Sequence, residues 1–260
     1  MTGAMTINAD GTHRADASLK GKLRRRLVRL AHRRAAGRVP ERPMLSFSFD
    51  DAPASAFGEG GAILSAKEMR ATYFVCAGLD GLSGPMVEYG TRADISSAHA
   101  AGHEIADHTF SHMDLGEASA QAVNADLDRN ARALSDWGLP APATFAYPFG
   151  DVGFASKRVA GARFQLARGL HHGIVKAGAD LAQAPAVGVE GDGGEALAHD
   201  WLEQLSQGGG WLILFSHAVT DLPSPFGMSK TALAGLADAA TERGFEVVTV
   251  AQGAARVRAA

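Results

Sequence analysis

The sequence predicts an α/β fold in which a parallel sheet is covered by helices. Short apolar segments of strand length alternate along the chain with longer segments of helical composition, and this alternation is typical of parallel sheets. At 260 residues, the chain is long enough for one large domain with a substantial apolar core. The sequence shows no internal repeat and no cysteine pattern typical of a zinc ribbon.

Each element of this alternation can be placed approximately. Strands are expected near residues 44–50, 71–76, 102–107, 143–147, 163–168, 185–189, 211–216 and 245–248. Helices are expected near residues 57–69, 91–101, 117–137, 151–161, 195–207 and 229–243. The clearest helix begins at Glu117, and Gly138 and Pro140 end it because glycine and proline are frequent just beyond a helix C-terminus.

The first predicted strand is followed by two carboxylates. The segment that begins at Met44 alternates apolar and small polar residues, then reaches Asp50, Asp51 and a turn at Pro53. Neighbouring side chains on an extended backbone point in opposite directions, so one acid can bind a metal while the other lies beside it. Taken alone, such a pair is more often a turn feature than a catalytic one.

Two histidines follow the third predicted strand at a spacing that suits a shared metal. His108 and His112 lie four residues apart, and both imidazoles can reach one ion if the backbone is helical there. Asp107 is a candidate to accept the other N–H of a ligating imidazole. His99 and His103 fall outside this spacing and are predicted to be structural. An isolated histidine pair would more often be a surface feature.

These residue types together match the ligands of a catalytic zinc. Such a site keeps about three protein ligands and leaves one position open for water or substrate. A neighbouring carboxylate can then act as general base toward that water. The two acids at 50 and 51 and the two histidines supply this set.

Two later strands also end in polar or turn residues. The strand at 143–147 breaks at Pro148, Phe149 and Gly150, which leaves backbone N–H groups available to an oxyanion. The apolar strand at 211–216 is followed by His217. In parallel α/β barrels the C-terminal ends of strands are where catalytic residues gather. Each motif is weak alone, but the four in this order indicate one active site.

At these positions the chain resembles the NodB-type polysaccharide deacetylases, which are carbohydrate esterase family four. The segment Ser48-Phe49-Asp50-Asp51 is similar to the first motif of that family, and His108-Thr-Phe-Ser-His112 closely matches the second. The strand that leads to His217 is similar to the last motif. The resemblance covers roughly residues 43–250 and implies a distorted (β/α) barrel of the NodB-homology type, preceded by a basic helical arm.

The resemblance also implies a role for each site residue. It implies that Asp51, His108 and His112 bind Zn²⁺ or another divalent transition metal. Asp50 would be the catalytic base, and His217 would protonate the leaving amine. The backbone N–H of Phe149 would help to stabilise the oxyanion.

Two positions depart from the family pattern. The third motif often carries an arginine two residues before the proline, where this chain has Ala146; Arg163 or Arg168 in the next predicted strand is the candidate replacement. The Asp-and-Trp motif that supports the final histidine is also unclear. Asp200-Trp201 has the right residue types but falls in a predicted helix, where Asp200 is expected at the surface and Trp201 in the core.

The implied activity is metal-dependent hydrolysis of N-acetyl groups on N-acetylglucosamine-type residues. The implied substrate is a bacterial exopolysaccharide or its lipid-linked precursor, as for the exopolysaccharide and holdfast deacetylases of Gram-negative bacteria. One alternative is another amide hydrolase on the same scaffold, such as one that opens a small cyclic amide. Another is a non-catalytic carbohydrate-binding protein, which the missing arginine favours and the intact acids and histidines weigh against.

Charge divides the chain into a basic arm, residues 1–42, and an acidic catalytic domain, residues 43–260. The arm holds eleven Lys and Arg against three acids, whereas the rest holds fourteen against twenty-five. Four leucines fall on one face of a predicted helix: Leu19, Leu23, Leu27 and Leu30. Residues 18–34 could lie on an anionic membrane, where each basic residue would add about 1 kcal/mol of binding free energy. Alternatively, this helix could pack against the acidic barrel or against the second subunit of a homodimer.

The expected location is cytoplasmic, with peripheral contact at the inner membrane face. The arm does not resemble a secretory signal because arginines interrupt its apolar positions. No apolar run approaches the ~20 residues that span a bilayer. Cys76 is the only cysteine, so no internal disulfide can form, and it is expected to be a buried thiol. Nucleic-acid binding is not expected, since the arm has no aromatic residues for stacking.

Overall fold

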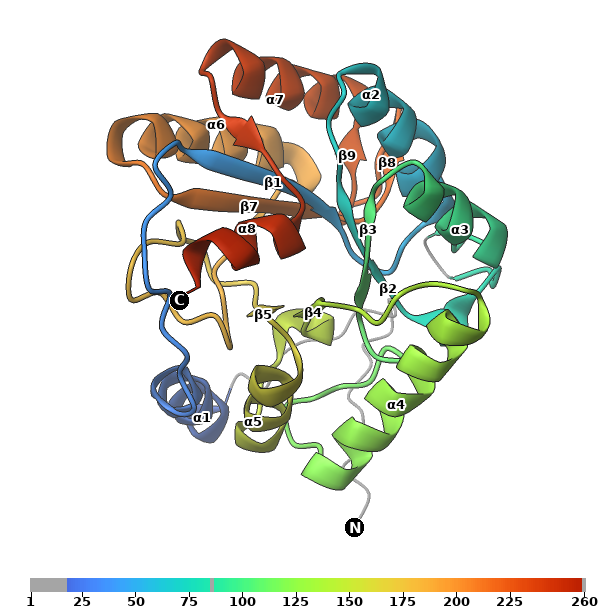
Figure 1. Ribbon diagram of the computed structural model, residues 1–260, viewed down its shortest axis with the longest axis vertical. Helices are drawn as coiled ribbons and strands as arrows, with labels where there is room; N and C mark the ends of the chain where they lie inside the picture. Colours follow the sequence, from blue (N-terminus) through green and yellow to red (C-terminus); the bar gives the residue numbers. More distant parts are fainter. Residues whose placement is uncertain (1–17, 85–86, 259–260) are drawn as a thin grey trace.

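The computed structural model describes residues 18–84 and 87–258 and is built around one curled parallel sheet (Figure 1). The strand order is β5-β4-β3-β2-β1-β7-β6, and β10 also pairs with β1. Every pairing in this sheet is parallel. The strands are β1 (Met44–Phe49), β2 (Thr72–Val75), β3 (Glu104–Asp107), β4 (Thr144–Ala146), β5 (Leu166–Arg168), β6 (Val187–Gly188), β7 (Trp211–Ser216) and β10 (Glu246–Val247). The predicted α/β barrel fold is confirmed.

Eight helices accompany this sheet in the described residues, and all but α8 lie on its outside. They are α1 (Leu19–Leu30), α2 (Gly61–Ala66), α3 (Arg92–Ala100), α4 (Ala120–Asp136), α5 (Phe154–Arg163), α6 (Gly191–Gly208), α7 (Lys230–Glu242) and α8 (Val250–Val257). The helix predicted at 57–69 is instead a π-helical turn, Ala56–Gly60, followed by α2. Helix α8 and the small pair β8 (Val219–Thr220) and β9 (Met228–Ser229) were not predicted, because segments this short carry little periodic signal.

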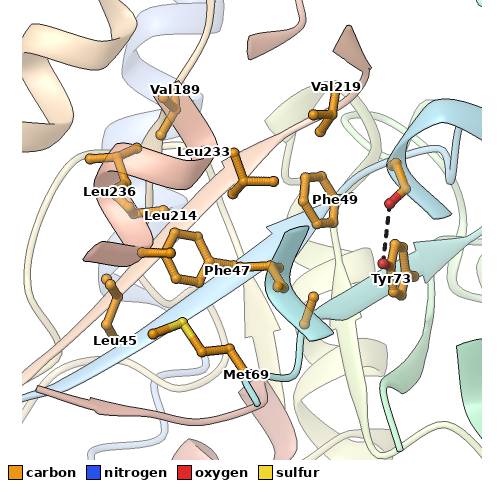
Figure 2. Packing of buried hydrophobic residues seen from close by; sticks show 14 of the residues in the cluster. Leu45, Phe47, Phe49, Met69, Tyr73, Val189, Leu214, Val219, Leu233 and Leu236 are labelled. Carbon is orange, nitrogen blue, oxygen red and sulfur yellow. Dashed lines mark hydrogen bonds between the residues drawn. The ribbon is translucent and has the colours of Figure 1, made fainter. Parts of the chain in front are cut away.

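The outer face of the sheet forms the larger apolar core. On β1, Leu45, Phe47 and Phe49 point to this side and pack with Leu233 and Leu236 of α7 (Figure 2). All five are almost completely buried. Burial of one such side chain contributes about 1.5–3 kcal/mol, so alternation along β1 fixes which face of the strand meets the helices.

The inner face of the sheet is closed at one end by α8. Met44 and Trp211 pack there with apolar residues of α8, and the Trp211 indole N–H donates to the Ser46 hydroxyl at 2.9 Å. A Cβ on Gly253 of α8 would lie 2.4 Å from the Trp211 ring, so only glycine allows this approach. Alternate residues of β1 point to the inner face of the sheet, namely Ser46 and Ser48, and Asp50 continues this alternation just after the strand. The Asp50 side chain is therefore directed toward the interior of the curl.

Helix α1 packs on the barrel, but not through its leucines. Val28 is fully buried among apolar residues of α4 and α5, and the Arg24 guanidinium donates to both carboxylate oxygens of Asp151 at 3.0 and 2.8 Å. Lys157 of α5 donates to the Val28 carbonyl at 2.8 Å, and α1 lies beside α5 (Figure 1). The predicted row of leucines faces away from the barrel. Residues 1–17 of the predicted arm lie outside the described residues.

None of the helices described has the length and apolar content that crossing a membrane requires.

Candidate active site

Six of the chemically active side chains come from the ends of parallel strands. Because parallel strands end on the same edge of a sheet, residues distant in sequence meet there. Asp50 and Asp51 follow β1, His108 follows β3, and Arg168 ends β5. Glu190 lies just beyond β6, and His217 directly follows β7.

Asp51, His108 and His112 form a cluster that fits one metal ion. Each offers one ligand atom, and these atoms all lie within 4.8 Å of one another. The Asp51 Oδ1 atom is 3.0 Å from His112 Nε2 and 3.4 Å from His108 Nε2, yet it is buried and has no hydrogen-bond partner. A buried, unpartnered carboxylate oxygen between two imidazole nitrogens is the environment that a divalent cation would satisfy.

The orientation of His108 supports this interpretation. Its Nδ1 atom donates to the Ala146 carbonyl at 2.8 Å, so the Nε2 atom carries the lone pair on the side of Asp51. Asp107 does not play this part, contrary to prediction: it accepts from the Thr109 N–H at 2.8 Å, and burial raises its pKa to about 7. The backbone carbonyl of Ala146, on the neighbouring strand β4, is the hydrogen-bond partner of His108 instead.

The charges around Asp51 favour its ionised form. Burial alone would raise the pKa of Asp51, but the nearby His112, His108 and His217 hold it well below its usual range. The carboxylate is therefore available as an anionic ligand across neutral pH.

A loop, not a helix, brings the two histidines together. Residues 108–115 form no helix, and both Thr109 and His112 have positive φ angles, 64° and 52°. Asp126 of α4 pins this loop by accepting the N–H groups of Phe110 and Ser111 at 2.8 and 3.1 Å. The helical argument for the spacing was therefore wrong, although the convergence that it predicted is present.

The two acids after β1 do separate, but through a turn in the chain. Asp51 has a φ of 59°, so the extended backbone assumed for the pair ends at Asp50. Left-handed backbone costs a non-glycine residue roughly 1–3 kcal/mol, a strain that is common at functional sites. This turn carries Asp51 toward the histidines, while Asp50 stays in the interior of the curl.

Arg168 supplies the arginine that the third motif lacks. Its Nη2 atom donates to both carboxylate oxygens of Asp50 at 2.5 Å, and the guanidinium lies over the rings of Phe74 and Phe215, 5.1 and 4.7 Å from their centroids. In the β4–β5 pairing Arg168 is the register partner of Ala146. The arginine therefore comes from the strand next to the one that carries it in the family motif. Arg163, the other candidate, forms a surface ion pair with Asp128 at 2.7 Å.

Glu190 supports His217 in place of the expected Asp-and-Trp pair. The His217 Nδ1 atom lies 2.5 Å from Glu190 Oε1 and 3.1 Å from the Phe226 carbonyl, and its Nε2 atom lies 3.9 Å from Asp51 Oδ2. Burial would lower the pKa of His217, but Glu190, Asp51 and Asp50 raise it to about 9. His217 is therefore protonated at neutral pH.

Sequence reasoning missed Glu190, although a signal was present. It directly follows the strand predicted at 185–189, and β6 pairs with β7, which ends beside His217. Asp200 is exposed, and Trp201 packs against the core, as predicted.

Phe149 lies at the edge of the metal cluster. Its ring packs edge-on against His112 with centroids 4.3 Å apart, and its φ is 57° in the turn Pro148–Gly150. Gly150 is also left-handed, and a Cβ there would lie 2.4 Å from Leu170. The turn at the end of β4 is thus fixed against the cluster. The role of its N–H groups toward an oxyanion stays a prediction.

Two other residues are structural, as predicted. His103 accepts the Ala71 N–H through Nδ1 at 3.0 Å and lies 3.3 Å from the Ser65 hydroxyl. Cys76 is buried, and burial raises the pKa of its thiol well above the usual value.

Comparison with known proteins supports the fold. Residues 37–163 match the family model described as polysaccharide deacetylase, which confirms the resemblance for that segment. No curated protein sequence matches the chain.

Several solved structures share the fold at low identity. A candidate polysaccharide deacetylase from Mycobacterium smegmatis is 20% identical, with a TM-score of 0.65 over 87% of this chain and 95% of that chain. The chitin deacetylase of the fungal pathogen Colletotrichum lindemuthianum is 18% identical, with a TM-score of 0.59 over 84% and 89%. A family 4 acetyl xylan esterase from Clostridium thermocellum, in complex with a cobalt ion, is 19% identical, with a TM-score of 0.56 over 81% and 89%.

We expect the purified chain to bind one Zn²⁺ or Co²⁺ ion, measured by titration calorimetry on metal-stripped protein. His108→Ala should weaken binding by more than the ~10–100-fold typical of changes around the ligands, because it removes a donor atom. Asp50→Asn is the matched control and should keep the metal, since Asp50 lies beside the cluster. Equal loss in both variants would contradict the ligand set.

Proposed function

We propose that this chain, whose residues 37–163 match the polysaccharide deacetylase family model, removes N-acetyl groups from N-acetylglucosamine-type residues of a bacterial exopolysaccharide or its lipid-linked precursor. The observation that carries the proposal is the cluster of Asp51, His108 and His112, with Asp50 ion-paired to Arg168 and His217 Nε2 3.9 Å from Asp51. Such an arrangement offers a candidate base and a candidate acid near one metal site, as hydrolysis of an amide requires.

In this proposal one residue of the site accepts a proton and another donates one. Asp50, oriented by Arg168, takes a proton from the attacking water. His217, whose Nδ1 atom is held by Glu190, donates a proton from Nε2 to the departing nitrogen. The N–H of Phe149 would stabilise the oxyanion. A divalent cation bound by Asp51, His108 and His112 would supply Lewis-acid polarisation of the acetyl carbonyl and of the water.

The pKa of His217 supports this division of labour. A group with a pKa of about 9 is protonated at neutral pH and can act as an acid from the start of the reaction. Asp50 is paired with the Arg168 guanidinium, which holds the carboxylate in position.

The proposed substrate class is supported by the solved structures that share this fold. Similar structures include a chitin deacetylase and an acetyl xylan esterase, and the latter contains cobalt, which supports a transition metal, proposed here to be Zn²⁺. The choice of exopolysaccharide rests on the proposed cytoplasmic location. The missing arginine had favoured a non-catalytic carbohydrate-binding protein, and Arg168 removes that argument.

The decisive test is acetate release from N-acetylglucosamine oligomers by the metal-loaded chain. We expect turnover by the natural chain, and a fall of ~10²–10⁴-fold in kcat for Asp50→Asn, the size of one general-base contribution. Full activity of Asp50→Asn would contradict the role of Asp50. Oligomer binding without acetate release would identify a carbohydrate-binding protein, and hydrolysis only of small cyclic amides would identify another amidase.

Arg168→Gln should lower kcat for acetate release by about 10²-fold or more, because it removes the group that orients the base. Arg163→Gln is the matched control and should keep activity, since its ion pair is on the surface. Leaving a buried carboxylate unpaired can cost about 3–5 kcal/mol, so unfolding curves must show both variants folded at the assay temperature.

A double variant, Ala146→Arg with Arg168→Ala, separates positioning from stability. It returns the arginine to the register position on β4, and partial recovery relative to Arg168→Ala alone is expected. Unchanged activity in Arg168→Gln would contradict the assignment.

Glu190→Gln should move the alkaline limb of the kcat profile to lower pH. The carboxylate is one of the groups that raise the pKa of His217 to about 9, so its neutral replacement lets that pKa fall, and the acid form is lost at lower pH. The expected movement is roughly 1–3 pH units, the usual effect of a close opposite charge. Asp192→Asn, an exposed acid at the start of α6, should leave the profile in place. An unmoved alkaline limb in Glu190→Gln would contradict the role of His217.

A further inference from the structure

We propose that α1 docks the protein on an anionic lipid bilayer through its four leucines, while its opposite face stays bound to the barrel. This inference goes beyond the deacetylation proposed above and does not depend on it. It follows from the exposure of the leucines, the attachment of α1 and the charges beside the leucine row.

The leucine row of α1 is the largest set of exposed apolar side chains in the described residues. Leu19, Leu23, Leu27 and Leu30 are 85%, 58%, 46% and 70% exposed. The other large apolar side chains that are exposed in the described part of the chain belong to separate segments: Val39, Leu82, Phe154 and Leu222. A contiguous apolar row on a surface marks an interaction site, whereas scattered ones are ordinary.

The attachment of α1 holds this row outward. Gly21 and Val28 on the opposite face are buried, and Arg24 pairs with Asp151 at 2.8 Å. Lys157 binds the carbonyl of Val28 and also pairs with Asp180 at 2.7 Å. Rotation of α1 to bury the leucines would break these contacts. The helix is therefore fixed with an apolar side facing solvent.

The charges beside the row select an anionic partner. Lys22, Arg26 and Arg29 are exposed and lie along one flank of the leucines at helical spacing. The sequence from 18 to 34 contains no Asp or Glu. A helix with aliphatic residues on one side and cations at its flank is typical of helices that lie in the headgroup region of a bilayer.

A second copy of the chain fits this surface less well. Pairing two α1 helices would bury the leucines but bring Arg26 and Arg29 of both copies together with no acid on either helix. Docking elsewhere would need a matching apolar patch, and the remaining exposed apolar residues within the described ranges are scattered. An anionic bilayer offers both an apolar layer and negative charge.

Sedimentation of the full chain with vesicles tests the proposal. We expect binding to vesicles of equal parts phosphatidylcholine and phosphatidylglycerol at low salt, and much weaker binding to phosphatidylcholine alone. Leu23→Gln with Leu27→Gln should reduce partitioning more than about 10-fold. Lys22→Gln with Arg26→Gln should reduce it ~5-fold per charge on the anionic vesicles only.

The matched control is Leu82→Gln with Leu222→Gln, which removes two exposed leucines from other segments and should leave partitioning unchanged. Unaltered thermal unfolding of the α1 variants would show that they remain folded. Failure of the natural chain to bind anionic vesicles would overturn the proposal. So would a dimer, seen by light scattering, that the leucine substitutions dissociate in a chain that does not bind vesicles.

Discussion

The buried ion pair between Asp50 and Arg168 is the interaction on which the site depends. It joins the end of β1, at the centre of the sheet, to the end of β5, at its edge. Both side chains are taken out of water, so each carries a desolvation cost that only the other offsets. The stacking of Arg168 on Phe74 and Phe215 fixes the guanidinium, and the carboxylate position follows from it. A carboxylate held in this way is already oriented before any ligand binds.

Much of this could be predicted from residue pattern alone. The segment from 44 to 49 alternates apolar residues with serines, and this alternation predicted the strand that ends at Asp50. The pair of histidines predicted a metal site because few other uses need two imidazoles and a carboxylate at strand ends. Local pattern succeeds here because the residues that form each motif are adjacent in sequence.

The parts that pattern reasoning left open or missed depend on pairing between distant strands. Arg168 replaces an arginine at Ala146 because the two positions are neighbours in the β4–β5 register, although 22 residues separate them in sequence. Glu190 reaches His217 because β6 lies beside β7. Either of two neighbouring strands can place a guanidinium or a carboxylate at the same position in the site. A motif can therefore disappear from the sequence while its charge stays in place.

The same reasoning connects α1 to the active-site edge of the barrel. Arg24 binds Asp151, which follows the turn that carries Phe149 and Gly150. Gly116 lies against this pair so closely that a Cβ there would be 2.4 Å from Asp151 Oδ2 and 2.8 Å from Arg24 Nη1. The basic helix is thus attached to a loop at the C-terminal end of a strand, the edge where the candidate site lies. A surface bound by the leucines of α1 would be linked to that edge through the partly buried ion pair of Arg24 with Asp151, the residue directly after the turn.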